Sequence, residues 1–396
     1  MHKVLFIAAH FPPCEEIGGS IRSEKFIQYL KEFGWSALVV SIGESNEGPS
    51  LLDESHQVLR IKSLTPYKKP YEITAYGWAL NVWRYLKSFQ DCHLIYVSCP
   101  PFPQILTSVF FKKRLGKPLV LDFRDAWSLD PYQEGSRFKK FVYKFIFPKI
   151  EKWAFSYSDG VILNTPSTLK AYQSHYPEYA SKMFLITNGY DEKAFLGLSH
   201  LHEQKKGGMS ILYCGRFGVG GRKVESLLDG LALTRNELNI KLSIYGNQPE
   251  NIAGLIREKG LDDCVDCNEQ IPHFEALQKM YQHDVLLMYQ EESSSEVQPI
   301  AGKTFEYIRV GKPVLSIAPP GDNQALIRRY VKIHEIVEDA TPENIAKGLQ
   351  SLYLKWSRGK LNHLNIPDES FSKNYERREL TRKLCALFDS YILKDK

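Results

Sequence analysis

Short apolar segments rich in β-branched residues alternate along the chain with longer segments of helical periodicity. Continuous apolar strands separated by helices indicate parallel sheets that are covered by helices on both faces. The predicted strands form two series with a gap between them, at Val4–Ala9, Ala37–Ile42, Leu94–Ser98, Leu119–Phe123, Gly160–Asn164 and Met183–Thr187, then Ile211–Cys214, Lys241–Tyr245, Val265–Cys267, Val285–Tyr289 and Pro313–Ile317. Two such series predict two doubly wound α/β domains.

The gap between the two series marks a predicted domain boundary. Residues 197–208 are mostly polar, end in two glycines and follow neither period, so we expect them to link a domain over 1–196 to a domain over 209–374. A length of 396 residues also suits two domains. Residues 375–396 place apolar side chains on one face of a helix, and we expect this helix to pack back on the first domain.

Composition narrows the class of protein. A hydrophobic share of 43% and a charged share of 24% are typical of a folded globular chain. The net charge of +5 suits a partner that carries phosphates, such as a nucleotide or an anionic membrane. The sequence lacks zinc-finger spacing, a heptad-linked basic region and the aromatic signature of RNA-binding modules, so we do not expect nucleic acid as a partner.

Cysteine usage and hydropathy indicate the compartment. The seven cysteines are scattered, which is typical of free thiols in a reducing compartment. The N-terminal residues have a strand pattern without the long apolar stretch of a signal peptide, and no run of ~18 apolar residues follows. We expect a cytoplasmic protein that is at most peripheral on the inner face of the membrane.

In doubly wound folds, ligands bind beyond the carboxyl ends of the strands, so the loops that follow the strands are the first places to look for chemistry. Gly18 and Gly19 follow the first strand and precede a predicted helix. Backbone N–H groups at such a helix start can bind an anion or a sugar, although a plain turn explains the glycines equally well. The dinucleotide fingerprint GxGxxG is absent, which argues against a nicotinamide enzyme.

Charged residues come directly after the apolar strand that ends at Phe123. Charges at such a position are costly unless they are paired or functional. An ion pair between Arg124 and a carboxylate that holds the loop is one explanation. The other is functional: if the two domains face each other, ligands bind in the cleft between them, and Asp125, together with Arg124, lies at the mouth of that cleft near a hydroxyl group of an acceptor substrate.

A glycine-rich loop with several cations follows the first strand of the second series. The loop contains Arg216, Arg222 and Lys223 and leads into a helix predicted over 224–233. Guanidinium groups grip phosphate oxygens bidentately, and a helix N-terminus adds partial positive charge, so the loop is suited to a diphosphate. A solvated loop without a ligand is the alternative.

The sequence Gly-Lys-Thr that ends at Thr304 resembles the end of a Walker P-loop. We reject this interpretation because Val297 stands where the motif needs glycine and no apolar strand precedes it. A short helix over 305–310 that carries Glu306 fits better. This carboxylate can accept both hydroxyls of a ribose while Lys303 lies near phosphate or sugar; a surface glutamate without a ligand is the alternative.

Taken together, these segments resemble the GT-B-fold glycosyltransferases, specifically the large retaining group called family 4 (glycosyl transferases group 1). The resemblance runs almost the whole length of the chain. Single motifs are weak, but their order and spacing are specific: Phe-Pro-Pro before Gly18-Gly19, Glu151-Lys-Trp-Ala154 before Ser158-Asp-Gly-Val-Ile162, Asn188-Gly-Tyr-Asp191 with Phe195, Gly215-Arg216, Tyr245-Gly246 and Lys303-Thr-Phe-Glu-Tyr-Ile-Arg-Val-Gly-Lys-Pro-Val314.

The resemblance implies two Rossmann-like domains that face each other across a cleft, with a nucleotide sugar held mainly by the second domain. It implies that Arg216 and a following cation contact the donor diphosphate, and that Glu306 contacts the ribose. It also places further donor contacts at Gly18, Gly19, Gln298, Lys303 and Thr304.

Three departures from the family pattern affect these assignments. The family has two glutamates separated by seven residues, and Gln298 takes the place of the first one. The cationic loop is one residue longer than usual, so Arg222 or Lys223 is the second phosphate cation. Many members carry His-Asp where this chain has Arg124 and Asp125.

The predicted reaction is sugar transfer with retention of configuration from a UDP- or GDP-linked donor to a lipid-linked or saccharide acceptor in surface polysaccharide or glycoconjugate synthesis. The chain has no DxD metal motif, so we expect fixed cations, and no metal or other cofactor, to stabilise the leaving diphosphate. Arg216 with Lys223 or Arg222 is predicted to do this. Asp125 is predicted to have a supporting role.

Residues 137–149 alternate cations with aromatic and aliphatic side chains. Such a basic amphipathic segment can lie in the interface of an anionic membrane, or it can be an ordinary helix that faces the core with solvated lysines. Two further functions are compatible with the sequence as a whole. One is a nucleotide-sugar 2-epimerase on the same architecture, and the other is a nucleotide-sugar-binding subunit without activity, which Gln298 suggests.

Overall fold

A computed structural model of the chain describes residues 1–12, 20–43, 50–51, 53, 55–65, 71–130, 137, 141–198, 207–217, 224–290, 296–361 and 364–393. The chain forms two compact units, each described here by itself. Unit 1 comprises Met1–Asn188, Ser295–Pro299 and Arg377–Lys396, and unit 2 comprises Gly189–Ser294 and Ile300–Glu376. Most of the predicted linker, residues 199–206, lies outside the described residues.

The chain passes into unit 2 at Gly189, upstream of the predicted linker. The physical reason is that Tyr190, Phe195 and Leu198 are buried in a hydrophobic core of unit 2. In the other direction, the short segment Ser295–Pro299 belongs to unit 1, where Val297 is buried in a hydrophobic core. The units are therefore not two uninterrupted stretches of sequence.

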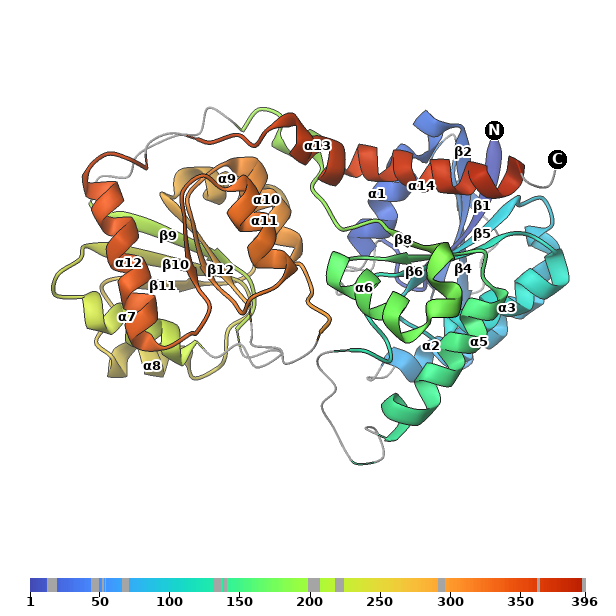
Figure 1. Cartoon of the computed structure of the whole chain (residues 1–396), viewed down its shortest axis with the longest axis horizontal. Coiled ribbons are helices and arrows are strands. Elements are labelled where there is room, and N and C mark those ends of the chain that lie inside the picture. Colours follow the sequence, from blue (N-terminus) through green and yellow to red (C-terminus); the bar gives the residue numbers. More distant parts are fainter. Residues whose placement is uncertain are drawn as a thin grey trace. The chain divides into compact units, whose positions relative to one another are not determined.

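Unit 1 contains a sheet in the order β3-β4-β2-β1-β5-β6-β7-β8, parallel except for the β3–β4 pair (Figure 1). Its strands are β1 His2–Ile7, β2 Trp35–Gly43, β3 Ser50–Leu51, β4 Gln57–Lys62, β5 Leu94–Cys99, β6 Leu119–Phe123, β7 Gly160–Leu163 and β8 Met183–Leu185. The sequence pattern did not predict β3 and β4. They form the edge of the sheet, where a polar face toward solvent weakens the apolar signal.

Both faces of this sheet are covered, because side chains along a strand alternate between two cores. Leu5 and Ile7 of β1 lie in one core, and Val4 and Phe6 in the other. The helices of unit 1 are α1 Ser20–Leu30, α2 Tyr71–Val82, α3 Gln104–Leu115, α5 Phe147–Tyr157, α6 Pro166–His175 and α14 Arg377–Ile392, with shorter helical segments η1 Lys31–Phe33, η2 Trp83–Phe89, η3 Val142–Ile146 and η4 Pro177–Lys182.

The C-terminal helix α14 packs against α1 and the sheet of unit 1 (Figure 1). Leu380, Leu384 and Phe388 are buried in the same core as α1. The indole Nε1 of Trp35 donates a 2.9 Å hydrogen bond to Asp389 Oδ1. The apolar face that the sequence shows on this helix is thus the face that contacts unit 1.

Unit 2 contains a wholly parallel sheet in the order β11-β10-β9-β12-β13-β14. Its strands are β9 Met209–Cys214, β10 Ile240–Tyr245, β11 Val265–Asn268, β12 Val285–Tyr289, β13 Val314–Ile317 and β14 His334–Val337. One face packs against α7 Glu225–Thr234, α8 Ile252–Glu258 and α12 Pro342–Ser357. The other packs against α9 His273–Gln282, α10 Gly302–Val310, α11 Asp322–Tyr330, α13 Glu369–Tyr375 and the short η5 Glu192–Phe195.

Each unit is therefore a doubly wound α/β domain with a mainly parallel sheet, as the sequence predicts. None of the helices in the part of the chain that the structure describes is both long and apolar enough to cross a bilayer.

Candidate active site

The helix α10 brings one predicted donor residue to the carboxyl end of β9. The Lys303 ammonium donates a 2.7 Å hydrogen bond to the Cys214 carbonyl, and it lies 4.1 Å from the centre of the Tyr213 ring. Burial raises the pKa of the Cys214 thiol to about 11, with Lys303 and Glu306 as its charged neighbours. Lys303 thus lies at the edge of the sheet where ligands bind in this fold class.

Two glycines let the loops after β9 and β10 approach each other closely. Gly246 has φ +133°, and a Cβ placed on it would lie 2.2 Å from the Gly215 carbonyl oxygen. A Cβ on Gly215 would lie 2.5 Å from the Lys303 ammonium. The loops are also joined by a 2.9 Å hydrogen bond from Gly215 N to the Tyr245 carbonyl. Any side chain at these two positions would displace the backbone or the cation.

Arg216 comes directly after Gly215 and its side chain is exposed. Its backbone carbonyl accepts a 3.3 Å hydrogen bond from the hydroxyl of Tyr213, the residue whose ring centre lies 4.1 Å from the Lys303 ammonium. Arg216 and Lys303 are therefore both placed around the carboxyl end of β9. The predicted second cation, Arg222 or Lys223, lies outside the described residues, as do Gly18 and Gly19.

Glu306 lies one turn after Lys303 on α10, and its side chain is 20% exposed. Its Oε1 lies 2.7 Å from Nε2 of His273, the first residue of α9. The carboxylate is thus at the surface of unit 2 and is held by a neighbouring helix.

Thr304 and Gln298 are placed differently from the other predicted donor residues. The Thr304 side chain is fully buried, and its hydroxyl hydrogen-bonds to Asn323 Oδ1 on α11. Gln298 belongs to unit 1, where its backbone N donates a 2.9 Å hydrogen bond to Ser167 Oγ in the first turn of α6. The Thr304 hydroxyl therefore serves the packing of α10 on α11, and the Gln298 backbone is tied to α6.

Unit 1 presents Asp125 in the loop that follows β6. The Asp125 carboxylate is 60% exposed, and its Oδ2 lies 3.5 Å from Arg124 Nε. The Arg124 backbone is fixed on both sides, because its N–H donates to the Cys99 carbonyl and its carbonyl accepts from Asn164 Nδ2 at 2.8 Å. Asp125 thus pairs with Arg124 in the loop and is also exposed at the edge of the sheet, so the structural and the functional explanation of these charges are compatible.

The other end of this loop is held by the buried carboxylate of Glu151 on α5. Its Oε1 accepts hydrogen bonds from Ser128 N and the Tyr172 hydroxyl, both at 2.8 Å, and its Oε2 accepts one from the Tyr176 hydroxyl at 2.7 Å. Burial raises the pKa of Glu151, while these hydrogen bonds oppose the rise. The Trp127 N–H also donates to the Tyr172 hydroxyl at 2.9 Å.

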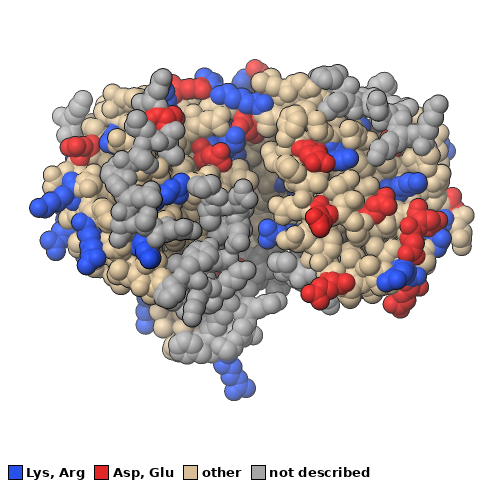
Figure 2. Space-filling view, turned by 180° about the vertical axis from the view of Figure 1, so that it is seen from behind, with Lys and Arg blue, Asp and Glu red and all other residues tan. Residues whose placement is uncertain are grey.

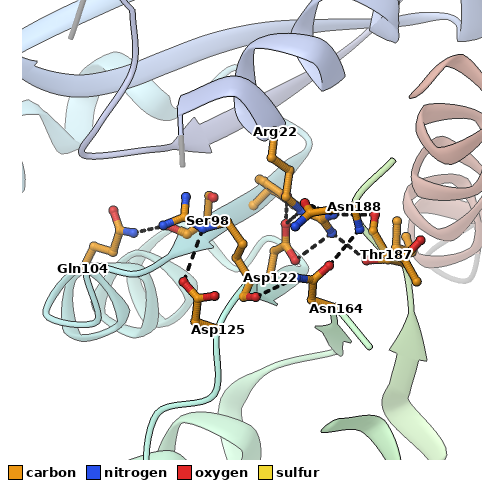
Figure 3. Close-up of polar contacts among 11 residues, drawn as sticks. Arg22, Ser98, Gln104, Asp122, Asp125, Asn164, Thr187 and Asn188 are labelled. Carbon is orange, nitrogen blue, oxygen red and sulfur yellow. Dashed lines mark hydrogen bonds and ion pairs between the residues drawn. The ribbon is translucent and has the colours of Figure 1, made fainter. Parts of the chain in front are cut away.

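A second buried network joins α1 to the carboxyl ends of β6 and β8. Arg22 Nε and Nη2 lie 2.8 and 3.1 Å from the two carboxylate oxygens of Asp122. Its remaining donors reach the Thr187 carbonyl at 2.6 Å and the Ile186 carbonyl at 2.8 Å (Figure 3). The Tyr96 hydroxyl also hydrogen-bonds to Asp122. Because Arg22 lies in the first turn of α1, the network fixes the helix start that follows Gly19.

His10, three residues after the end of β1, lies near the Arg124 cation. Burial, and secondly the charge of Arg124, lower the pKa of His10 to about 4, so this imidazole is neutral at physiological pH. Within the residues that the structure describes, no group of three or more His, Cys, Asp or Glu side chains is placed to hold a metal ion.

Residues 18–194 match the family model of Glycosyltransferase Family 4. The matched segment contains Asp125, Glu151 and the Arg22 network, and the architecture of both units agrees with the fold that the sequence resemblance implies. The chain has the fold of the GT-B glycosyltransferases, and its residues 18–194 are similar to Glycosyltransferase Family 4.

Solved structures support the same fold for the whole chain. A sucrose-phosphate synthase from Thermosynechococcus elongatus has a TM-score of 0.76 at 17% identity, over 98% of this chain and 99% of that one. HepE of Anabaena, solved with UDP and glucose, has a TM-score of 0.65 at 15% identity, over 98% of this chain and 100% of that one. WaaG, a glycosyltransferase involved in lipopolysaccharide biosynthesis, has a TM-score of 0.63 at 13% identity, over 97% of this chain and 99% of that one.

No curated protein matches the chain in sequence. The comparisons do not favour the 2-epimerase alternative. The sequence analysis missed three features: the Arg22–Asp122 pair, His10 and the contact of His273 with Glu306. Arg22 had a usable signal, since it is a charge on the apolar face of a helix, one turn before Phe26. His273 had none, because it stands in a polar segment that is remote from Glu306 in sequence.

Proposed function

We propose that the protein is a glycosyltransferase that transfers a sugar, with retention of configuration, from a UDP- or GDP-linked donor to a lipid-linked or saccharide acceptor in surface polysaccharide or glycoconjugate synthesis. The observation that carries the proposal is the arrangement at the carboxyl end of β9. There, Lys303 contacts the Cys214 carbonyl, Arg216 follows in the adjoining loop, and Glu306 lies one turn along α10. The two cations are suited to binding a diphosphate, and the carboxylate is suited to accepting hydrogen bonds from the hydroxyls of a ribose.

The chemistry of the leaving group explains why cations are needed there. Departure of a nucleoside diphosphate builds negative charge on its phosphate oxygens, and fixed positive groups stabilise that charge without reorganising. We assign this task to Arg216 together with Arg222 or Lys223, with Lys303 nearby and with the backbone at Gly18 and Gly19. Glu306 is assigned to the ribose. The proposal includes no metal ion or other cofactor.

Two of the similar solved structures carry ligands that fit the proposal. HepE of Anabaena is described in complex with UDP and glucose, and in another structure with UDP-glucose. These ligands belong to that protein, and they make UDP-linked donors the first candidates for this one. Gln298, which replaces the first family glutamate, is proposed to face the transferred sugar, and Asp125 to lie near the acceptor hydroxyl.

A surface of unit 1 supports a peripheral membrane location for the acceptor. Apolar side chains on η3 and α5 and just before them are exposed, with exposed fractions of 51% for Phe141, 48% for Phe145, 39% for Ile146 and 36% for Trp153. The same stretch exposes the cations Arg137, Lys144, Lys149 and Lys152. The opposite face of α5 is buried through Ala154 and Phe155, so this helix is anchored in the core and exposes aromatic and basic side chains on its other side.

Cations of the neighbouring helix α3 extend this basic surface. Lys113 and Arg114 are exposed in its last turn, and Lys113 lies 4.1 Å from the centre of the Tyr157 ring of α5. Basic side chains also gather without acidic ones at the lower left of Figure 2, over unit 1. Aromatic side chains among lysines and arginines are suited to the interface of an anionic bilayer. We propose that unit 1 binds the membrane there.

A thermal-shift screen tests the donor proposal directly. The protein is heated with UDP-glucose, UDP-galactose, GDP-mannose, UDP, GDP and CMP at concentrations well above micromolar. A ligand at 100 times its Kd stabilises the native state by about 2.7 kcal/mol, which raises Tm by several degrees. Stabilisation by a UDP or GDP compound, followed by transfer to a lipid-linked or saccharide acceptor that EDTA does not slow, is expected. No shift with any of these nucleotides would refute the proposal.

A further inference from the structure

The contact between His273 and Glu306 has no place in the assignments above. His273 Nε2 lies 2.7 Å from Glu306 Oε1. We propose that His273 is a positioning residue that orients the Glu306 carboxylate toward the ribose hydroxyls of the donor. This inference rests on the proposed function, because it assumes a nucleoside diphosphate at the carboxyl end of β9.

The position of His273 is fixed by the helix that it begins. Pro272 precedes it with φ −56° and ψ 149°, and the ring of proline keeps this φ. Further along α9, Leu277, Met280 and Tyr281 are buried in a hydrophobic core of unit 2. The backbone at His273 therefore has little freedom, and the imidazole starts from a defined point next to α10.

Glu306 is fixed in the same way on the other helix. Its neighbour Phe305 on one side and Tyr307 and Ile308 on the other are buried in the same core that anchors α9. Only the side chain of Glu306 remains adjustable, and a glutamate has several rotatable bonds whose ordering costs free energy. The hydrogen bond from His273 removes part of that freedom before a ligand arrives, which is preorganisation.

The geometry leaves the carboxylate able to bind a diol. A carboxylate has about four lone-pair sites, and the imidazole uses one of them. Glu306 is 20% exposed and His273 is 56% exposed, so the pair lies at the surface and is accessible to a ligand. The direction of the carboxylate decides whether both ribose hydroxyls can donate to it at once, and this direction is what His273 sets.

The nearby cation Lys303 does not take over this task. It lies three residues before Glu306, but its ammonium is directed to the Cys214 carbonyl and the Tyr213 ring. Lys303 and Glu306 are thus directed to different places. The Lys303 ammonium is directed toward the loop proposed to bind phosphate, and the Glu306 carboxylate, proposed to bind the ribose, is directed toward α9.

The experiment measures recognition of the ribose 2′-hydroxyl. Isothermal calorimetry gives the Kd of UDP and of 2′-deoxy-UDP, or of the GDP pair where guanine is preferred, for the wild type, His273→Ala, His273→Gln and Glu306→Ala. His273→Ala should weaken UDP binding by roughly 3- to 10-fold and leave 2′-deoxy-UDP binding nearly unchanged, which corresponds to the loss of one hydrogen bond. His273→Gln, which keeps an N–H donor, should recover part of the discrimination.

A purely structural role would change both affinities together, so the ratio of the two Kd values separates the explanations. His175→Ala is the matched control, because His175 is also a partly exposed histidine near a glutamate, Glu296, but lies in unit 1. In the double variant with Glu306→Ala, His273→Ala should have no further effect. The inference is overturned, and the proposed function is left standing, if the ratio of the Kd values for 2′-deoxy-UDP and UDP stays at its wild-type value in His273→Ala but falls to about one in Glu306→Ala. A wild type that binds neither UDP nor GDP overturns both.

Discussion

Arg22 and Asp122, one hundred positions apart in the chain, form a completely buried two-pronged ion pair in unit 1. Although burial lowers the pKa of the Arg22 guanidinium, Asp122 and Tyr96 raise it by more, so the arginine stays charged. The remaining guanidinium donors are used by carbonyls at the end of β8. The pair therefore joins α1, β6 and β8 at the edge of the sheet where α1 begins.

Replacing Arg22 with alanine should destabilise the protein strongly. The Asp122 carboxylate and two backbone carbonyls would lose their donors in a buried site, and breaking a buried ion pair costs about 3–5 kcal/mol. Urea unfolding monitored by tryptophan fluorescence measures the loss. Glu24→Ala, on the exposed face of the same helix, is the control and should change the free energy of unfolding by less than about 0.5 kcal/mol. An Arg22→Ala protein as stable as the wild type would contradict the network's role.

Stability at acidic pH should depend on His10. Its pKa in the folded protein is lowered to about 4 from 6.5, so between these values the unfolded chain binds a proton that the folded chain does not. Stability must then rise with pH over this window, and it is lost as the pH falls from 6.5 to 4. His10→Gln removes this component, worth roughly 1–3 kcal/mol.

Thermal unfolding at pH 7 and pH 4.5 checks this prediction. The drop in Tm between the two values should be smaller in His10→Gln than in the wild type. His175→Gln, at an exposed histidine, should keep the wild-type drop. An equal drop in His10→Gln would show that the imidazole is protonated in the folded state.

Gly246→Ala should disturb the loop that carries Arg216. The new Cβ would lie 2.2 Å from the Gly215 carbonyl oxygen, and φ +133° is unfavourable for alanine, so the two loops must separate. We expect a loss of about 1–3 kcal/mol in stability and weaker binding of the nucleoside diphosphate. Calorimetry and thermal unfolding give both quantities.

The matched control for this glycine is Gly254→Ala within α8. A Cβ at Gly254 meets no atom within 4 Å. Because alanine is the better helix former, this variant should be more stable than the wild type by about 0.5–1 kcal/mol, with unchanged nucleotide affinity. If both variants bound the nucleotide equally well, the close approach of the two loops would be unimportant for the donor site.

Arg216→Ala should abolish sugar transfer and leave the fold intact. Removing one fixed charge from the leaving group should lower kcat by about 10²–10³-fold, by analogy with the loss of one oxyanion donor. The exposed position of Arg216 predicts an unchanged Tm without ligand. Arg257→Ala, at an exposed arginine of α8, controls for the loss of a surface charge. Near wild-type turnover in Arg216→Ala would remove this residue from the mechanism.

Binding to anionic vesicles should depend on two exposed aromatic side chains, Phe141 directly before η3 and Phe145 within it. The double variant Phe141→Ser and Phe145→Ser should co-sediment with phosphatidylglycerol-containing vesicles at least several-fold less than the wild type, and added salt should weaken wild-type binding. Leu354→Ser, at an apolar residue of α12 that is 50% exposed, should bind like the wild type. Equal sedimentation of the double variant and the wild type would leave these residues without a membrane role.

Much of the fold could be predicted from the sequence because hydrophobic periodicity is a local property. The apolar run at Val4–Ala9 predicted a strand covered on both faces, and the structure divides its side chains between two cores. The short helix predicted over 305–310 to carry Glu306 is likewise present in α10, which begins three residues earlier and so also includes Lys303. For these features, the sequence alone was sufficient: burial on one or both faces is recorded in the residues themselves.

The tertiary structure alone decided which distant residues meet. Arg22 with Asp122, His273 with Glu306, and Glu151 with Ser128 are pairs whose members lie on different elements, and no periodicity records the partner. The same is true of Ser295–Pro299, which belongs to unit 1 although the sequence around it forms unit 2. Local patterns report whether a side chain is buried, whereas sheet order and helix packing determine what it is buried against.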